Sequence, residues 1–246
     1  RLFSQNLFDR FTSRDSKDNK LFLLDRVLKQ QYRELIDQAI FHGGTVGIEQ
    51  ERYTKRLKLS HGDSQLPFMT WTAGQREFTP MLLGLYHLLP PRKLQKIKNI
   101  DWLIIEEPEM GLHPQAVMVF MLLVLDLLWR GYKVVLSANS PQVLTVLGNH
   151  GRLRENQARW QLVCEAFGID KPRADLQKVA TAALKKELRV HLLSFANDGK
   201  VVASDISSLD PGADDDNESG WGGLTGFAAR CGDVVRKSVQ ERPDEP

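Results

Sequence analysis

The sequence predicts an α/β fold in which a mostly parallel sheet is flanked by helices. Two short apolar runs, 102–105 (WLII) and 133–137 (KVVLS), have the length and composition of strands buried on both faces. We expect a helix over 114–129 between them, because an apolar stretch follows Pro114 and proline suits a first helical turn. A further helix is expected from Pro141. Strand, helix, strand, helix in this order is typical of a parallel sheet.

Upstream of this unit the hydrophobic period changes twice. Residues 1–20 are polar and are expected to form a loop, and apolar residues then recur every three or four positions over 21–40, which predicts a helix that ends at Gly43 and Gly44. Over 45–70 apolar and polar residues alternate, which predicts a strand or hairpin region. A helix over 76–89 is expected next, ended by two prolines.

The remainder of the chain predicts a smaller appendage. Residues 152–167 and 173–190 have the pattern of two helices, and 189–206 that of a hairpin about an Asn-Asp-Gly turn. The tail from Asp210 is rich in Asp, Gly and Ser, and we expect loop with one short helix near 223–237.

Composition sets broad limits on function. The chain has 246 residues, of which 42% are hydrophobic and 26% charged, as in an ordinary globular protein. A net charge of +2 gives no electrostatic reason to expect DNA or RNA as an obligatory ligand. Cys164 and Cys231 lie far apart and form no metal-binding pattern. The local basic residues fit a solvated face: Arg92, Lys93, Lys96 and Lys98.

Three further features bear on location and domain organisation. No signal peptide opens the chain, and the apolar run at 116–125 is too short to span a bilayer, so we expect a cytoplasmic protein without a membrane partner. The chain starts at Arg1 and its first methionine is Met69, which suggests part of a longer polypeptide. We expect three segments: 1–44 as an N-terminal loop and helix, 45–150 as the core, and 151–246 as the appendage.

Glu106 and Glu107 follow the apolar run at 102–105 directly. The carboxyl ends of strands are where open α/β sheets bind ligands, and two adjacent buried carboxylates are costly unless a cation compensates them. Neighbouring strand residues point to opposite sides, so one carboxylate can reach a metal and the other a water. The alternative is a solvated strand end that happens to be acidic.

The surrounding residues, 103–114 (LIIEEPEMGLHP), resemble the Walker B and D-loop segment of ABC-type ATPases. The form is similar to that of the overcoming-lysogenization-defect (OLD) ATPases and of related bacterial AAA-type ATPases. The resemblance implies that Glu106 holds Mg²⁺ and that Glu107 is the general base. It also implies that 110–113, with Gly111 and His113, form the D-loop at a dimer interface.

Residues 71–77 (WTAGQRE) precede a predicted helix, and small residues at a helix N-terminus leave backbone N–H groups available to an anion. The alternative is an ordinary N-cap. The segment resembles the ABC signature motif and, as in that family, lies ahead of the Walker B strand. The resemblance implies nucleotide contacts, to a γ-phosphate held by the opposite subunit, from these residues: Thr72, Ala73, Gly74 and Gln75.

Residues 137–141 (SANSP) resemble the switch strand of the family, where a histidine usually senses the γ-phosphate. Asn139 occupies that position, and an amide donates a hydrogen bond but carries no positive charge. This departure predicts slow hydrolysis. The alternative is a turn residue ahead of Pro141.

The chain contains no GxxxxGK[ST] sequence. In the family the P-loop precedes the signature motif, so the resemblance places it upstream of Arg1. OLD nucleases add an acidic metal site, but the DxD pattern at 214–216 lies in a Gly-rich tail and fits a solvated loop.

The resemblance implies an ATPase head that binds ATP with Mg²⁺ and works as a head-to-tail homodimer. Such heads commonly act as a sensor or motor coupled to an effector protein in phage defence or DNA maintenance. Two other interpretations stay open: a scaffold that assembles without hydrolysis, and an OLD-like nuclease ATPase.

Overall fold

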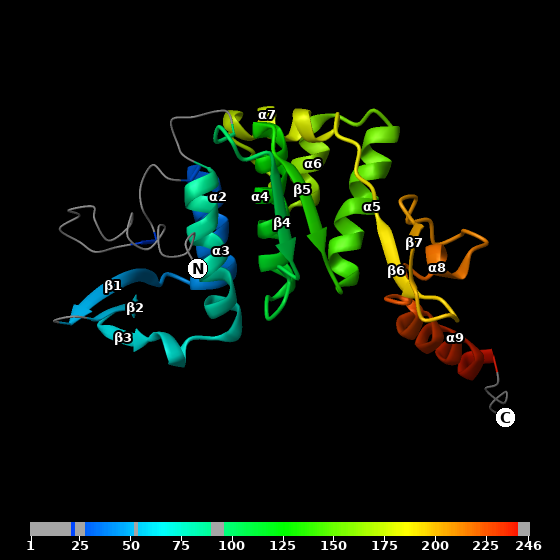
Figure 1. Ribbon diagram of the computed structural model, residues 1–246, viewed down its shortest axis with the longest axis horizontal. Coiled ribbons are helices and arrows are strands. Elements are labelled where there is room, and N and C mark those ends of the chain that lie inside the picture. The colour runs from blue at the N-terminus through cyan, green and yellow to red at the C-terminus, as the bar shows by residue number, and fades with distance from the viewer. Residues whose placement is uncertain (1–20, 23–27, 52–53, 90–95, 241–246) are drawn as a thin grey trace, which may run out of the picture. The chain divides into compact units, whose positions relative to one another are not determined.

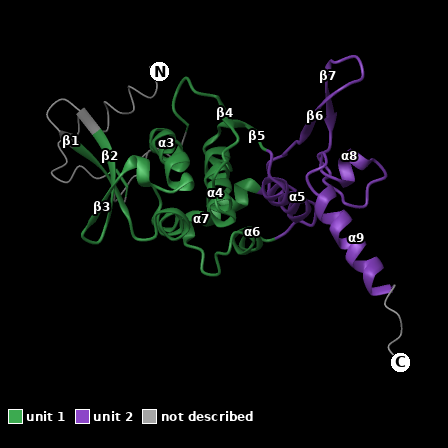
Figure 2. Cartoon of the chain, turned by 90° about the horizontal axis from the view of Figure 1, so that it is seen from below, with its two compact units in different colours: residues 1–138, 159–183 green, residues 139–158, 184–246 purple. Residues whose placement is uncertain are grey.

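The computed structural model describes residues 21–22, 28–51, 54–89 and 96–240. The expectations for 1–20, for 23–27 in the first predicted helix, for the two prolines at 90–91 and for Arg92 and Lys93 lie outside these residues. The chain divides into two compact units (Figure 2). Unit 1 comprises 1–138 with 159–183, and unit 2 comprises 139–158 with 184–246.

The first predicted helix is shorter than expected at its start. Helix α2 spans Gln30–Ile36 and continues into a π-helical turn, η1 (Asp37–Phe41), which ends as predicted ahead of two glycines. The prediction of helix from residue 21 is wrong, because the N–H groups of Leu21 and Phe22 donate to the carbonyl oxygen of Val46, at 2.7 and 3.1 Å. These two residues therefore lie beside a strand.

The segment over 45–70, in which apolar and polar residues alternate, contains a three-stranded antiparallel sheet. This agrees with the prediction of a strand or hairpin region. Strands β1 (Thr45–Glu51), β2 (Thr54–His61) and β3 (Ser64–Pro67) pair in sequence order. A 3₁₀ turn, η2 (Phe68–Thr70), then leads into helix α3 (Ala73–Leu88), which begins three residues before the predicted start.

The predicted strand–helix–strand unit is confirmed. Strand β4 (Trp102–Glu106) and strand β5 (Lys133–Ser137) are parallel neighbours, and the helix between them is α4 (Pro114–Arg130) (Figure 1). Helix α4 is buried around most of its circumference, because it contacts α2, η1, β5 and α7 (Ala174–Ala183). Another helix of unit 1, α6 (Trp160–Ala166), packs against α7.

The expectation that β4 and β5 are buried on both faces is wrong. Leu103 and Ile105 are half-buried on one face, whereas Trp102, Ile104 and Val135 on the other face are 59%, 75% and 48% exposed. We call this second face the open β4–β5 face. Among the described residues β4 and β5 form the only parallel pair, and the other two sheets are antiparallel. The chain is therefore mixed α/β, with small sheets.

A buried ionic cluster joins α2 to α4. The carboxylate of Asp126, which is fully buried, accepts hydrogen bonds from the Tyr32 hydroxyl at 2.8 Å and from Nε of Arg130 at 2.7 Å. The Lys29 ammonium also donates to it. One carboxylate inside an otherwise apolar helix is thus compensated by two cations and a hydroxyl.

Unit 2 begins with helix α5 (Pro141–Glu155). The predicted hairpin is confirmed as strands β6 (His191–Phe195) and β7 (Val201–Asp205), and two helices follow, α8 (Asp216–Ser219) and α9 (Gly226–Gln240). A small core holds the unit together, formed by Leu144, Ile206 and Leu209 with half-buried neighbours.

The predicted helix over 152–167 is wrong. Helix α5 continues to Glu155, and the chain then breaks at Gln157, which has a φ of +50° in the left-handed region, before α6 begins at Trp160. The second predicted helix, 173–190, ends seven residues early with α7, at Ala183.

Over the described parts of the chain, the helices are too short or too polar to cross a membrane.

Candidate functional site

The two carboxylates of the EEPE segment lie where β4 ends. Glu106 is the last residue of β4, is exposed, and stands opposite Ser137 in the parallel register. Glu107 has left the strand, because its φ is +42°. The expectation that both residues alternate along one strand is therefore wrong for Glu107.

The conformation of Glu107 is held by strand β5. Its N–H donates to the carbonyl oxygen of Ser137 at 3.0 Å and lies 3.3 Å from the Ser137 hydroxyl oxygen. A left-handed backbone costs a residue with a side chain about 1–2 kcal/mol, so it persists only where neighbours fix it. Such strain is concentrated at functional sites, and here it turns the second carboxylate out of the strand direction.

After Glu107 the chain makes two successive turns into α4. The N–H of Met110 donates to the carbonyl oxygen of Glu107, and that of Leu112 to Glu109, both at 3.0 Å. His113 is the N-cap of α4, and its Nδ1 accepts from the N–H of Gln115 at 3.3 Å. The imidazole thus has a structural task, and Nε2 is the ring nitrogen that a ligand would meet.

The TAGQ segment forms the start of α3. Thr72 and Gln75 make a capping box: the Thr72 hydroxyl oxygen accepts from the N–H of Gln75, and the Gln75 side-chain oxygen accepts from the N–H of Thr72, both at 3.2 Å. Ala73 and Gly74 follow in the first turn, where backbone N–H groups have no acceptor within the helix. These two N–H groups lie at the positive end of the helix dipole, the combination that binds an anion.

The side chain of Gln75 does not face outward. It is almost fully buried, and its amide nitrogen donates to the carbonyl oxygen of Ile40 at 3.1 Å. The Thr72 hydroxyl accepts a hydrogen bond in the cap and keeps its own proton for another acceptor. Of the two side chains, Thr72 is the one available to a ligand.

Two glycines bring the signature-like and Walker B-like segments into contact. A β-carbon on Gly74 would lie 3.0 Å from the carbonyl oxygen of Gly111, and one on Gly111 would lie 3.4 Å from the β-carbon of Ala73. Gly111 also has a φ of +71°, which favours glycine. The start of α3 therefore packs directly on the turn that follows Glu106 and Glu107.

Asn139 belongs to unit 2, two residues beyond the end of β5, and is exposed. Ser140 caps α5 by accepting from the N–H of Gln142 at 3.2 Å, and Pro141 fills the first turn. Because the cap is formed by Ser140, the Asn139 side chain is not needed to start the helix.

In the acidic segment at 214–216, one aspartate caps a helix. Asp215 is the N-cap of α8, accepting from the N–H groups of Asn217 and Glu218 at 2.8 and 3.1 Å. The three residues at 214–216 are exposed, as predicted, but the expectation of loop is wrong for Asp216, which is the first residue of α8. Within the described residues no three His, Cys, Asp or Glu side chains converge as a metal site. A Mg²⁺ ion held by one carboxylate, phosphates and waters needs no such cluster.

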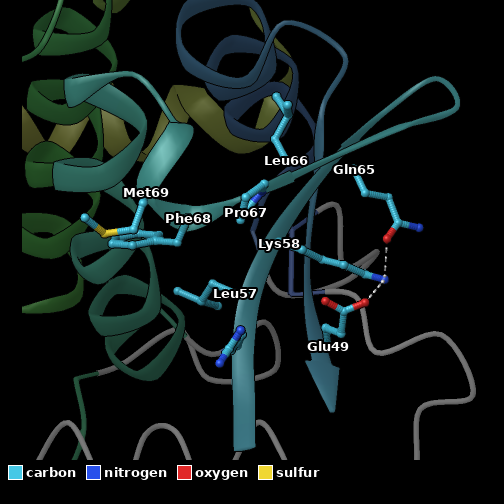
Figure 3. Close-up of a pocket in the computed structure, with 9 residues that line it drawn as sticks. Glu49, Leu57, Lys58, Gln65, Leu66, Pro67, Phe68 and Met69 are labelled. Carbon is cyan, nitrogen blue, oxygen red and sulfur yellow. Dashed lines mark hydrogen bonds and ion pairs between the residues drawn. The ribbon is translucent and has the colours of Figure 1, made fainter. Parts of the chain in front are cut away.

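A hollow of about 720 Å³ lies on the three-stranded sheet, ahead of the TAGQ segment (Figure 3). Its lining is mostly apolar, with Leu57, Phe68 and the exposed Met69 on one side. Lys58 is engaged there, since its Nζ lies 3.5 Å from a carboxylate oxygen of Glu49 and donates to Gln65 at 3.3 Å. None of the residues predicted as site residues lines this hollow.

Two features of the site were not predicted from the sequence. The contact of Gly74 with Gly111 links segments distant in sequence, although a glycine in each motif is a signal for it. The other feature is Ser137 at the end of β5, whose carbonyl and hydroxyl oxygens hold the N–H of Glu107. Comparison of the chain with models of known protein families, with curated proteins and with solved structures found no match.

Proposed function

We propose that this chain is part of an ABC-type ATPase head that binds ATP with Mg²⁺ and hydrolyses it slowly between two copies arranged head to tail. The observation that carries the proposal is the packing of Gly74 on Gly111. It places a helix N-terminus, which suits an anion, beside the turn that follows a strand end with two carboxylates. One copy can therefore present the N-terminus to a nucleotide held by the opposite copy and the carboxylates to its own.

The proposal gives each residue one task. Glu106 holds Mg²⁺ through water, and Glu107, turned away from the strand by its left-handed backbone, orients the attacking water. The N–H groups of Ala73 and Gly74 and the hydroxyl of Thr72 meet the γ-phosphate bound by the opposite copy. Gln75, buried against Ile40, fixes the helix start and acts as a positioning residue. Gly111 and His113 lie on the turn that faces the opposite copy.

The open β4–β5 face supports the same proposal. Parallel strands are normally covered on both sides, and Trp102, Ile104 and Val135 offer an apolar surface for another layer. An ATPase head needs a GxxxxGK[ST] segment, which is absent from these 246 residues. In our proposal a segment that carries this P-loop packs on the open β4–β5 face and presents the nucleotide to Glu106.

Asn139 favours a second candidate, an ATP-dependent scaffold that closes on ATP without turnover. Phosphoryl transfer depends on positioning and on charge stabilisation at the γ-phosphate, and a neutral amide supplies less of the latter than an imidazolium. The two candidates share the nucleotide site and differ only in whether phosphate is released. In both, coupling to an effector protein in phage defence or DNA maintenance rests on resemblance alone.

The test uses the protein that contains this chain together with its P-loop segment. We expect labelled ATP to bind only with Mg²⁺, and phosphate to be released slowly. Binding without any phosphate release would select the scaffold. The proposal fails if ATP does not bind, or if the complete protein and its obligatory partners contain no GxxxxGK[ST] segment.

A further inference from the structure

Helix α9 exposes a complete apolar stripe. Phe227, Val234, Val235 and Val239 are each at least 61% exposed, and no residue of this fully described helix is buried. At about 100° per residue, these side chains share one side of the helix with Cys231. We call them the α9 stripe, namely Phe227, Cys231, Val234, Val235 and Val239.

One border of the α9 stripe is positively charged. Arg230 and Lys237 are seven residues apart and therefore lie on the same side of the helix, next to Val234. Within the described residues neither has an ion-pair partner, whereas Arg236 on the far side pairs with Asp233 at 3.3 Å. A surface that covers the stripe should therefore be apolar with a carboxylate at its edge.

The hairpin of unit 2 exposes an apolar face with a carboxylate at its edge. Cross-strand pairs place Leu193 opposite Ala203 and Phe195 opposite Val201, and Leu193, Phe195 and Val201 are each at least 61% exposed. The other face turns Leu192 toward the small core. We call the exposed side the outer hairpin face; its residues are His191, Leu193, Phe195, Val201, Ala203 and Asp205.

The outer hairpin face carries its carboxylate at one end. Asp205 is the last residue of β7, and hydrogen bonds from the Ser207 hydroxyl and N–H hold its pKa below the usual range. The Asp205 carboxylate is therefore ionised throughout the neutral pH range. The whole face is about 13 Å long from His191 to Phe195, at about 3.3 Å per residue. The α9 stripe is about 18 Å long from Phe227 to Val239, at about 1.5 Å per residue, so the face fits within the length of the stripe.

We propose that the α9 stripe of one copy packs on the outer hairpin face of a second copy, with Asp205 meeting the cations of the helix border. Within one copy neither surface covers the other, since both are exposed. A helix stripe on a sheet face is a stable way to bury both. By two-fold symmetry the contact forms twice, which doubles the buried area toward that of a specific dimer.

The charges favour this pairing over a contact between two α9 helices. An antiparallel helix pair would set the border with Arg230 and Lys237 against the same border of its mate. The hairpin face instead offers Asp205. The contact needs no nucleotide, and so it is independent of the proposed ATP-driven dimer.

Cysteine pairing tests the contact directly. Cys231 lies within the α9 stripe and is exposed, whereas Cys164 is buried and its burial raises the pKa of its thiol. In Ala203→Cys the new thiol lies at the centre of the outer hairpin face. Under mild oxidation without nucleotide we expect a disulfide-linked dimer, because a disulfide forms only where β-carbons approach to about 4 Å.

The matched control is Ser194→Cys, which places an exposed thiol on the opposite face of the same hairpin. We expect little cross-linked dimer from it or from the unmodified chain. A disulfide within one copy of Ala203→Cys, no disulfide, or equal dimer yields from the two variants would overturn the proposal.

A second measurement does not depend on oxidation. In sedimentation velocity of the chain without nucleotide, we expect Phe195→Ser and Val235→Ser each to weaken dimerisation at least tenfold. Asp205→Lys should also weaken it, and combining Asp205→Lys with Arg230→Glu and Lys237→Glu should restore it. A monomeric unmodified chain, or no effect of the charge changes, contradicts the proposal.

Discussion

Gly74 and Gly111 are in contact although they belong to segments separated by a helix and a strand, and a β-carbon on the first would come within 3.0 Å of the carbonyl oxygen of the second. This contact sets the start of α3 against the turn after β4. A β-carbon at Gly74 would require the Gly111 carbonyl to shift by a few tenths of an ångström. At Gly111 the left-handed φ, and not a lack of space, disfavours a side chain.

Substitutions at Gly74 separate packing from phosphate recognition. Gly74→Ala adds one methyl group, and we expect a loss of about 1 kcal/mol in the free energy of unfolding with most ATP hydrolysis retained. Gly74→Asp adds a carboxylate that faces the γ-phosphate, and we expect hydrolysis to be abolished at a similar cost in stability. Urea unfolding and phosphate release measure the two effects. If both variants lose hydrolysis equally, the segment is only a helix start.

Substitutions at Asn139 test the slow turnover. Asn139→His supplies a charged donor and should raise the steady-state rate of phosphate release, whereas Asn139→Ala removes the donor and should lower it. Because Ser140 caps α5, both variants should keep the start of this helix, and urea unfolding measures the stability of each. A lower rate in the histidine variant, or no change in the alanine variant, would show that Asn139 is a turn residue.

The buried cluster around Asp126 predicts a large effect on stability. Asp126→Leu leaves the Lys29 and Arg130 cations buried without their carboxylate, and we expect a loss of about 3–5 kcal/mol in the free energy of unfolding. The triple variant with Lys29→Met and Arg130→Met removes all three charges and should recover most of that loss. Denaturant unfolding compares the two. A triple variant no more stable than Asp126→Leu would contradict this account.

The open β4–β5 face predicts that one substitution changes the free energy of unfolding differently in this chain alone and in the protein that also carries the P-loop segment. Ile104 is 75% exposed, so Ile104→Lys should change the free energy of unfolding of this chain alone by no more than about 0.5 kcal/mol. In the protein that also carries the P-loop segment, the same change would bury an ammonium group and should cost several kcal/mol. Equal small effects in both would mean that no layer packs on this face.

Most helices and strands could be predicted from the sequence because residues at their own ends determine where they begin and stop. Pro114 after a capping residue, Gly131 at the end of α4 and an Asn-Asp-Gly turn between alternating runs each fix a boundary. The failures occurred where a distant contact decided the outcome. Leu21 and Phe22 continue a helical period in sequence but bind the carbonyl oxygen of Val46.

The candidate site was predicted as residue types and not as geometry. The positions of Glu106 and the TAGQ segment at a strand end and a helix start follow from sequence. The left-handed turn of Glu107 did not, because it depends on hydrogen bonds to Ser137 in the next strand. The burial of Gln75 was also unforeseen, since its amide meets the carbonyl oxygen of Ile40, a residue far away in the chain. The exposed face of β4 could not be predicted because an apolar run is the same whether or not a second layer covers it.

The most direct test of the account is single-turnover hydrolysis by Glu107→Gln in the protein that carries the P-loop segment. Removal of a general base typically slows a reaction by about 10²–10⁴-fold, so we expect ATP and Mg²⁺ to bind normally while phosphate release slows by that factor. Glu106→Gln is the matched contrast, and it should instead weaken Mg²⁺-dependent ATP binding. If Glu107→Gln hydrolyses ATP at the unmodified rate, Glu107 is not the base, and the assignment of this strand end as an ATPase site is wrong.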